Sequence, residues 1–490
     1  MESLEPLEDL TMATRGETEV DLLIEGAELV NTLSGEVQRA DVAIHRGRTI
    51  GFDCSCARKS LNLSGSVLSP DFIDAHVPLE SAMVTVTEYA RDVVPEWITT
   101  SGGGSSRDCR CSGMKGVRYI LESSKDVPLN VYVMLSSCVP ATHLETSRAE
   151  LDVKALQELI DHERILGLAE VMNYPGVIYR NPAVLEKISM ARPKNIDGRP
   201  TRHSDRGLQA YIAARIRSDH ECSSLEDAKE KLRLGMSIII REGRAAENLQ
   251  DLLSLVTPLS SRQFMFVSED RHHSDIMDEG HINFMIGVAI QSGMDPTLAL
   301  QIASFNAARY FCLKDLGAIA PGFRADITVL DDLENLSVKK VFKDGRLVAE
   351  DGHILVPLPS PIISKGSAMR VRDLSLEKSE IPSAHELDFI RVTVAIPDQI
   401  VTKSLLLPAK ISEGKAIADI SRDILVMAVI ERHRTTGNVG LGFVQGFGLK
   451  GGTLATSVDH DPHNIAVVGI SSKGYALRRP GSYLHGRRAG

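Results

Sequence analysis

The stretch that decides the expected fold is Ser69-Pro70-Asp71-Phe72-Ile73-Asp74-Ala75-His76-Val77-Pro78-Leu79-Glu80-Ser81. Its apolar residues lead into Asp74 and His76 and stop at Pro78, which is typical of a buried strand that carries a histidine at its carboxyl end. In a parallel α/β barrel, chemistry is placed at the carboxyl ends of the strands. The stretch therefore predicts a functional His76 at the mouth of a barrel.

Residues 70–315 repeat an alternation of short apolar strands and longer amphipathic helices. The pattern indicates strands at 131–135, 165–170, 236–241 and 264–267, and helices at 153–163, 225–232 and 296–311. Repeated alternation over this length favours a (β/α)₈ barrel over an open sheet.

The segments on either side of the barrel have a different character. Residues 21–69 and 316–355 consist of short apolar runs punctuated by glycines, which predicts small β units. Residues 1–20 are expected to form a loose acidic leader. A proline-rich linker, Pro357–Pro361, introduces a third region, residues 356–490. A chain of 490 residues is accordingly expected to form two or three domains.

The composition excludes several functional classes. Hydrophobic residues make up 43% and charged residues 24%, as in a globular protein with an ample core. The net charge of -10 argues against a nucleic-acid surface. Because no apolar run of about 18 residues occurs, neither a membrane span nor a signal peptide is expected, and we predict a cytoplasmic protein. The 7 cysteines lack zinc-finger spacing and indicate reduced thiols.

The opening stretch closely resembles the first barrel strand of the amidohydrolase superfamily, which reads P-G-F-I-D-x-H-x-H. The next residues, Glu80-Ser81-Ala82-Met83, resemble the adenine deaminase branch, which reads H-x-H-x-E-S-S-M, and Ser457–Ile465 is similar to the C-terminal domain of that branch. The resemblance covers about residues 21–470. It implies a TIM-like amidohydrolase barrel over 70–315, a composite β-sandwich from both flanks, and a truncated C-terminal α/β domain over 356–490 with a divergent tail at 474–490.

Three further motifs resemble those of adenine deaminases. They are Gly167-Leu-Ala-Glu-Val-Met-Asn-Tyr-Pro-Gly176, Ile216-Arg-Ser-Asp-His-Glu-Cys222 and Val267-Ser-Glu-Asp-Arg-His-His273. The resemblance implies that His76, Glu170 and His220 are metal ligands, and that Glu269 and Asp270 are catalytic. Without the resemblance, Glu170 is interpreted as a helix-capping or rim carboxylate, and His220 as a surface hydrogen-bonding group.

The family function that the resemblance implies is the hydrolysis of adenine to hypoxanthine and ammonia. Metal ions supply the hydroxide that this reaction needs at neutral pH. The implied cofactor is divalent manganese or iron, and the implied partner is a small purine substrate, with no nucleic acid and no membrane. We also expect a homo-oligomer. The sequence assigns no residue to the purine ring.

Several positions depart from the family pattern. Pro78 replaces a metal histidine, and Arg199 stands where another belongs. Glu269 replaces an aspartate, and a displacement of that order can cost about 10²-fold in rate. An unpaired arginine beside a divalent ion would be costly to bury. His76, Glu170, His220 and Glu269 remain as candidate ligands of one ion, so a full binuclear site is not expected.

Two segments look like products of a shifted reading frame. Residues 101–113 have the length of the family motif V-V-A-D-P-H-E-I-A-x-V-L-G, and one permitted codon set reads A-V-A-D-P-H-E-I-A-D-V-L after a shift of one base. Residues 474–490 permit a similar reading. We therefore hypothesise a compensated frameshift at 101–113 and a truncating one near Lys473. The alternative is a natural flexible loop and a divergent tail.

Three functions remain open at this point: an adenine deaminase, a catalytically inactive paralogue or pseudogene product, and a single-metal hydrolase of other cyclic amidines or amides. Metal analysis combined with an ammonia-release assay on adenine separates them. The decisive geometric test is whether the candidate ligands converge at one mouth of the barrel.

Overall fold

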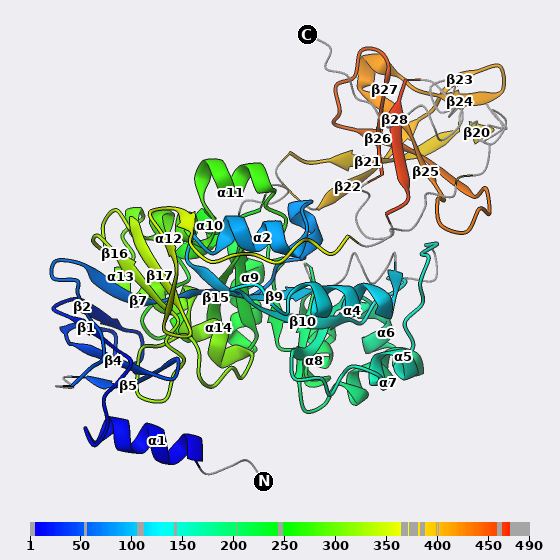
Figure 1. Ribbon diagram of the computed structural model, residues 1–490. Coiled ribbons are helices and arrows are strands. Elements are labelled where there is room, and N and C mark those ends of the chain that lie inside the picture. The colour runs from blue at the N-terminus through cyan, green and yellow to red at the C-terminus, as the bar shows by residue number, and fades with distance from the viewer. Residues whose placement is uncertain are drawn as a thin grey trace. The chain divides into compact units, whose positions relative to one another are not determined.

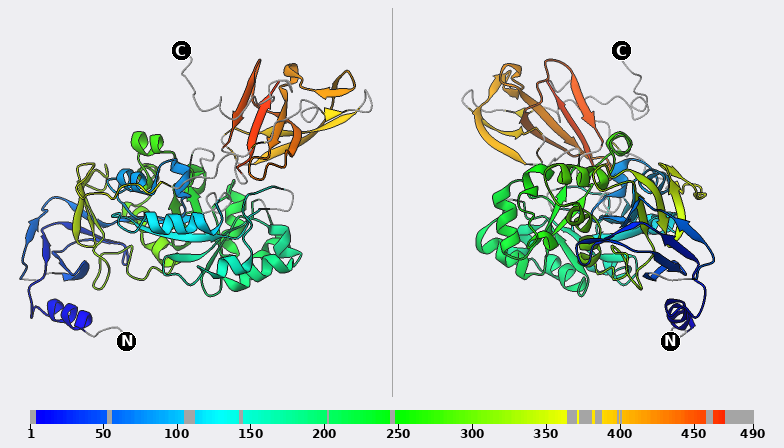
Figure 2. Two further views of the ribbon diagram at one scale, coloured as in Figure 1. Left: turned by 45° about the vertical axis from the view of Figure 1, so that its right-hand side comes forward. Right: turned by 90° about the vertical axis from the view of Figure 1, so that its left-hand side faces the viewer.

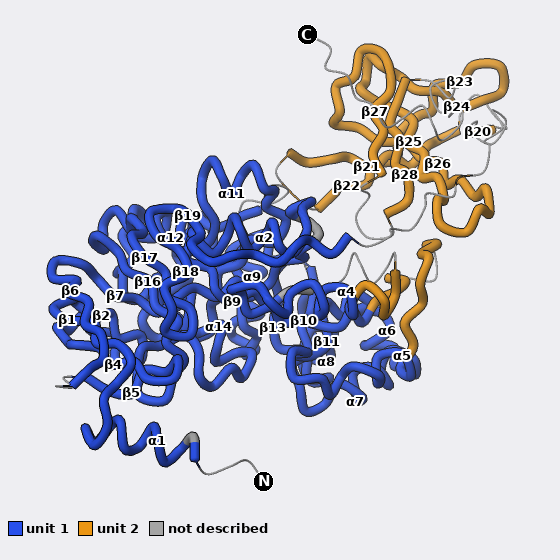
Figure 3. The backbone as a smooth tube through the Cα atoms, viewed as in Figure 1, with its two compact units in different colours: residues 1–105, 117–137, 153–363 blue, residues 106–116, 138–152, 364–490 orange. Residues whose placement is uncertain are grey.

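The computed structural model describes residues 5–52, 56–104, 112–141, 145–201, 203–243, 248–363, 371, 381–382, 388–397, 399, 401–457 and 463–470. The chain forms two compact units (Figure 3): residues 1–105, 117–137 and 153–363, and residues 106–116, 138–152 and 364–490. Within the suspected frameshift segments, residues 105–111 and 474–490 lie outside the described residues, as do residues 458–462 of the C-terminal motif. No helix in the described ranges combines the length and apolar character needed to cross a membrane.

Eight parallel strands form one sheet in the order β15-β14-β13-β12-β11-β10-β9-β8, and Figure 1 labels β9, β10 and β15 among them. They are β8 Phe72–Asp74, β9 Ile98–Gly104, β10 Asn130–Ser136, β11 Ile165–Val171, β12 Asn195–Gly198, β13 Ser218–Asp219, β14 Ser237–Arg241 and β15 Phe264–Val267. The two ends of the sheet meet where the Ser268 hydroxyl donates to Asp74 Oδ2 (2.5 Å) and Glu269 N donates to the His76 carbonyl (3.3 Å). The predicted barrel is thus confirmed as a nearly closed one.

Helices connect the successive strands of the barrel or follow its last strand, β15 (Figures 1 and 2). They are α2 Val86–Val93, α4 Met114–Ser123, α5 Val153–Gln157, α6 Tyr174–Ile178, α7 Pro182–Met190, α8 Asp205–Ala213, α9 Leu225–Arg233, α10 Leu249–Leu253, α11 His273–Glu279, α12 Ile282–Gln291, α13 Pro296–Ala303 and α14 Phe305–Tyr310. The helix predicted at 225–232 is confirmed as α9, which begins after Ser224, whose hydroxyl accepts from Asp227 N. The helix predicted at 296–311 is divided at Ser304, whose backbone is not helical (φ -130°, ψ -80°).

Strands from both flanks of the barrel build the neighbouring β layers. One sheet has the order β5-β4-β1-β6 and the other β19-β18-β17-β16-β7-β2-β3. Their bounds are β1 Leu22–Glu25, β2 Glu28–Asn31, β3 Glu36–Arg39, β4 Val42–His45, β5 Arg48–Phe52, β6 Ser60–Asn62, β7 Val67–Pro70, β16 Ile327–Leu330, β17 Val338–Lys343, β18 Arg346–Glu350 and β19 His353–Ile354. Pairing of β7 with β16 joins the two flanks, and side chains of both sheets share one apolar core.

Residues 5–20 are more ordered than the expected loose leader. Helix α1, Glu5–Thr14, contacts β5, and Ala13 is fully buried in a small apolar cluster with Val20 and Ile50. Asp9 forms ion pairs with His45 (2.8 Å) and Arg46 (2.6 Å). The expectation failed because these contacts come from strands that follow α1 in the chain.

The C-terminal unit contains a six-stranded sheet, β22-β21-β26-β25-β28-β27, and a three-stranded sheet, β20-β24-β23. Its strands are β20 Ile381–Pro382, β21 Phe389–Ala395, β22 Thr402–Pro408, β23 Lys410–Ser412, β24 Lys415–Ile417, β25 Ile424–Ile430, β26 Val439–Gln445, β27 Thr453–Thr456 and β28 Ile465–Gly469. Among the described residues after 363, no α-helix occurs. The described residues of this part therefore form β-sheets where an α/β domain was expected, because their apolar runs are β-branched and pair as strands.

Candidate active site

His76 lies two residues beyond the end of β8, where the carboxylate of Asp74 fixes the backbone. His76 N donates to Asp74 Oδ1 (3.3 Å), and Ser268 donates to the same side chain from its amide (3.3 Å) and its hydroxyl. His281 Nε2 lies 3.5 Å from Asp74 Oδ2 and 3.2 Å from the Tyr89 hydroxyl. These buried contacts set the position of His76 at the closure of the barrel.

Two glutamates at strand ends have backbone angles that are rare for residues other than glycine. Glu170, near the end of β11, has φ 44°, and Glu269, two residues after β15, has φ 53°. The Ser137 hydroxyl donates to the carbonyl of Glu170 (2.8 Å). Strained backbone of this kind persists where the surrounding structure imposes it, and it concentrates at functional sites.

Four of the residues predicted to be functional converge at one end of the barrel. Nε2 of His76 lies 3.3 Å from Glu170 Oε1 and 3.3 Å from Glu269 Oε2. The ring of His220, which follows β13, stacks on the ring of His76 with centroids 4.4 Å apart. One ligand atom each from His76, Glu170 and His220 lies within 4.8 Å of the others, and all four side chains are buried. We call these four residues the site cluster.

Asp270, the fifth predicted residue, is half-buried and lies beside the loop after β14. A Cβ atom added at Gly243 would lie 2.0 Å from Asp270 Oδ1, so this glycine provides the space for the carboxylate. Of the two adjacent acidic residues, Glu269 contacts His76, and Asp270 faces Gly243. Sequence alone could not distinguish them, because both follow the same strand.

The charges of the cluster shift its pKa values in different directions. Burial lowers the pKa of His76, but the adjacent carboxylates of Glu170 and Glu269 raise it to about 9. Burial and the charge of His76 hold the pKa of His220 well below its usual range. Burial opposes ionisation of Glu170, yet His76 and Arg199 hold its pKa well below the ordinary value. Burial, against the charge of His76, raises the pKa of Glu269. The cluster thus contains one carboxylate with a lowered pKa, Glu170, and one with a raised pKa, Glu269.

The donor atoms of the cluster fit one divalent ion. Both ring nitrogens of His220 and Nδ1 of His76 make no hydrogen bond to a described residue, although both rings are buried. Buried polar atoms without partners are costly, so their presence points to a ligand. Two imidazole nitrogens and a carboxylate oxygen are suitable ligands for a transition-metal ion.

Arg199 lies beside the cluster and is paired with carboxylates. Its Nη1 is 3.5 Å from Glu170 Oε2, and its Nη2 contacts Glu221 Oε1. Glu221 also receives a hydrogen bond from Thr201 (2.5 Å) and lies 3.6 Å from Arg241 Nη1. Glu221 and Arg241 were not predicted from the sequence. The available signal for Glu221 was its place directly after His220.

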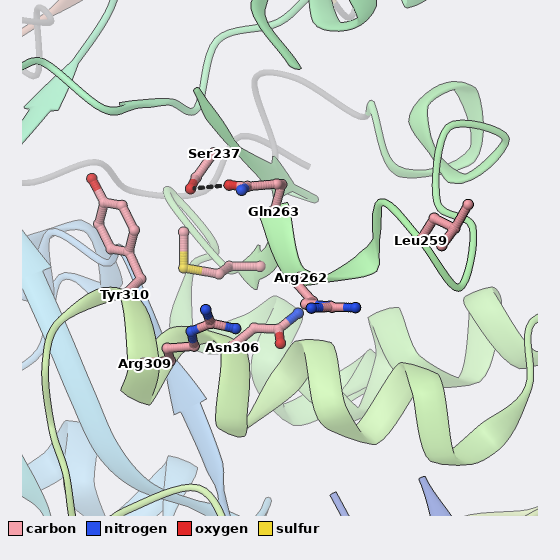
Figure 4. Close-up of a pocket in the computed structure, with 8 residues that line it drawn as sticks. Ser237, Leu259, Arg262, Gln263, Asn306, Arg309 and Tyr310 are labelled. Carbon is pink, nitrogen blue, oxygen red and sulfur yellow. Dashed lines mark hydrogen bonds between the residues drawn. The ribbon is translucent and has the colours of Figure 1, made fainter. Parts of the chain in front are cut away.

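The other end of the barrel contains a separate pocket of about 450 Å³ (Figure 4). It is lined by Ser237, Leu259, Arg262, Gln263, Met265, Asn306, Arg309 and Tyr310. Ser237 begins β14, and Phe264 begins β15, so this pocket lies at the amino ends of the strands. None of the predicted site residues lines it.

Comparison with known families and curated relatives gives two kinds of match. The amidohydrolase family model matches residues 67–348, and the model of the adenine deaminase C-terminal domain matches residues 399–477. The chain is 44% identical over 461 residues to an adenine deaminase of Desulfatibacillum aliphaticivorans, covering 94% of this chain and 80% of that one. It is 44% identical over 466 residues to an adenine deaminase of Methanothrix thermoacetophila, covering 94% and 81%.

Solved structures with a similar fold are much more distant in sequence. A β-aspartyl dipeptidase from Fervidobacterium islandicum AW-1 has a TM-score of 0.51 at 14% identity, covering 69% of this chain and 99% of that one. A D-hydantoinase from a Bacillus species has a TM-score of 0.51 at 14% identity, covering 68% and 96%. At this identity the likeness concerns the fold alone.

Proposed function

Because this chain belongs to the adenine deaminase family of amidohydrolases, we propose that it hydrolyses adenine to hypoxanthine and ammonia. The observation that carries the proposal is the convergence of His76, Glu170 and His220 from three different strands. Hydrolytic deamination exchanges the bond between the ring carbon and the exocyclic nitrogen for a bond to the oxygen of water. The site must therefore activate water and protonate the leaving nitrogen.

The residues proposed to hold the metal are His76, Glu170 and His220. Amidohydrolases depend on metals, and for this chain we propose a single manganese or iron ion. When bound, such an ion supplies the Lewis acidity that activates water at neutral pH. The positive charge of Arg199 beside Glu170 opposes a second ion at this place, and the side chain of Pro78 offers no ligand atom to the first.

Glu269 is proposed to move the proton. Its Oε2 lies 3.3 Å from His76 Nε2, and its burial raises its pKa. A carboxylate with increased proton affinity can accept a proton from water and then donate it to the departing amine, so that protons balance over the reaction. Asp270 remains the second candidate for this role, because it directly follows Glu269.

A catalytically inactive family member is the second candidate function. The contact of Arg199 with Glu170 (3.5 Å) favours it, because a guanidinium partly neutralises this carboxylate without any metal. An inactive chain would hold no ion and release no ammonia. A single-metal hydrolase of another cyclic amidine or amide would hold an ion and leave adenine unchanged.

The test uses the full chain in two forms, stripped with a chelator and reloaded with Mn²⁺. Bound metal is measured by mass spectrometry, and ammonia release is measured with adenine. We expect release from the reloaded form and none from the stripped form. Bound metal without release from adenine would contradict adenine deamination, and the absence of both would support the inactive candidate.

Assembly and substrate class are proposed from the sequence. We expect a homo-oligomer in the cytoplasm that acts on a free purine base and binds neither nucleic acid nor membrane. The net charge of -10 supports the exclusion of a polyanionic partner. Light scattering after size-exclusion chromatography tests the assembly, and a monomer at micromolar concentration would contradict it.

A further inference from the structure

The guanidinium of Arg199 lies between two nearly buried carboxylates at the barrel mouth. The side chain of Arg199 is 18% exposed, whereas those of Glu170 and Glu221 are 4% and 5% exposed. Burial of a charge is costly unless a partner compensates it. Each of these three side chains therefore depends on the others for its charge balance.

Glu170 faces a different neighbour with each of its oxygens. Oε1 lies 3.3 Å from Nε2 of His76, on the side of the candidate metal ligands. Oε2 lies 3.5 Å from Nη1 of Arg199. The carboxylate of Glu170 thus lies between the candidate metal ligands and the guanidinium of Arg199. A carboxylate in this position can be shared by two cations, one at each oxygen.

The backbone holds Arg199 in this place. Its amide donates to the Tyr211 hydroxyl (3.1 Å), which in turn donates to the carbonyl of Val171 (2.5 Å). The preceding position is closely packed, because a Cβ atom at Gly198 would lie 2.5 Å from Ile216 Cγ2. The backbone of Arg199 is therefore fixed by contacts at the barrel mouth, which keeps its guanidinium beside the site cluster.

We propose that the guanidinium of Arg199 is a permanent second cation of this site, so that the site accepts one divalent ion and excludes another. The inference depends on the proposed function, which places an ion beside His76, Glu170 and His220. Arginine stays protonated in proteins, so its charge cannot be removed to admit a metal. A second divalent ion sharing Glu170 would be repelled at close range by this fixed charge.

The stoichiometry of bound Mn²⁺ tests the proposal directly. Wild-type protein at saturating Mn²⁺ should hold one ion per chain. Arg199→His replaces the fixed charge by a metal ligand beside Glu170 and Glu221, and it should raise the count to two. Arg199→Lys keeps the charge and should stay at one. Circular dichroism and thermal unfolding establish that each variant is folded.

A second measurement needs no variant. Electron paramagnetic resonance of the Mn²⁺-saturated wild type should show the signal of isolated ions, without exchange coupling between neighbouring ions. Two coupled ions in the wild type, or a count of one in folded Arg199→His, would overturn the proposal. A wild-type count of zero would overturn it together with the metal assignment.

These results separate the inference from the proposed function. Counts of one in the wild type and two in Arg199→His, without ammonia from adenine, would support the inference and contradict the deaminase. Ammonia from a wild type that holds two ions would support the deaminase and overturn the inference.

Discussion

Two buried clusters of ionisable side chains in the barrel differ in how their polar atoms are bonded. In the Lys231 cluster, formed by Asp219, Cys222, Asp227 and Lys231, the ammonium lies 2.6 Å from Asp219 and 2.8 Å from Asp227. The thiol of Cys222 also contacts Asp219 (3.2 Å). In the site cluster, by contrast, both ring nitrogens of His220 and Nδ1 of His76 lack hydrogen bonds to the described residues.

The difference shows that buried charge alone does not mark a functional site. Burial by itself lowers the pKa of Lys231, but the charges around it, above all Asp219, raise it above the ordinary value. The ammonium is thus a permanent internal cation, and the acidic groups around it need no ligand. The site cluster retains bonding capacity, which is what a metal would use. Arg199 combines both situations. Its guanidinium balances part of the negative charge of the site cluster, as the ammonium of Lys231 balances the charge of its own cluster, while ring nitrogens of the site cluster stay unbonded.

The largest effect is expected from His220→Asn, which removes one of the unbonded imidazoles. Loss of a ligand from a three-residue set should reduce bound Mn²⁺ from one ion per chain to none and abolish ammonia release. Mass spectrometry of the metal and the adenine assay measure both. The matched control is His353→Asn, on the exposed strand β19, which should change neither. If His220→Asn kept the ion, the unbonded imidazole of His220 would not be a metal ligand, and the site cluster would no longer differ from the Lys231 cluster in this respect.

Glu269→Gln is expected to lower kcat by about 10² to 10⁴-fold while the metal stays bound, because glutamine keeps the size of the side chain and cannot exchange the proton. Steady-state kinetics with adenine and a metal count measure the two quantities. Asp270→Asn is the matched comparison, and we expect it to have the smaller effect because Asp270 faces Gly243. The reverse order would move the proton-transfer role to Asp270.

Lys231→Met should affect stability and leave the metal count unchanged. It leaves Asp219 and Asp227 buried without their cation, and breaking a buried pair in this way costs about 3 to 5 kcal/mol. Urea unfolding measures the loss. Lys229→Met, an exposed position on the same helix α9, should change stability by less than about 0.5 kcal/mol. A folded Lys231→Met protein that takes up an extra ion would show that this cluster, too, can hold a metal.

Much of the barrel and part of the site were predictable from sequence, for identifiable reasons. The apolar strand that ends at His76 has a local pattern, and Glu170 and His220 lie in long motifs that resemble the family. The contacts of Arg199 with Glu170 and Glu221 were not predictable, because they join the ends of β11, β12 and β13 across the barrel mouth. Such pairs depend on the barrel geometry.

The same reasoning explains the errors at the two ends of the chain. The acidic composition of residues 1–20 indicated a loose leader, but the docking of α1 depends on later strands. The region after 356 was expected from the resemblance to be an α/β domain, whereas in its described residues β25, Ile424–Ile430, pairs with the next strand, β26, and with the more distant β28. For α1 the deciding partners are remote in sequence, and for this region they are other strands of the same unit.

Asp9→Asn tests the docking of α1 and has the smallest expected effect. The carboxylate of Asp9 is 29% exposed and pairs with His45 and the half-exposed Arg46, and ion pairs of this kind contribute less than about 1 kcal/mol. The buried Ala13 should keep α1 in place, so global stability in urea should change little, while hydrogen exchange within residues 5–14 should become faster. Ala13→Asp provides the contrast, because it introduces a charge into the apolar cluster and should detach the helix. If Asp9→Asn exposed α1 as fully as Ala13→Asp, the ion pairs rather than the apolar contact would hold this segment. In that case the charges of Arg46 and His45 would be what holds α1 to the sheet, and a partly exposed ion pair would fix a segment as firmly as the buried ion pairs of the barrel do.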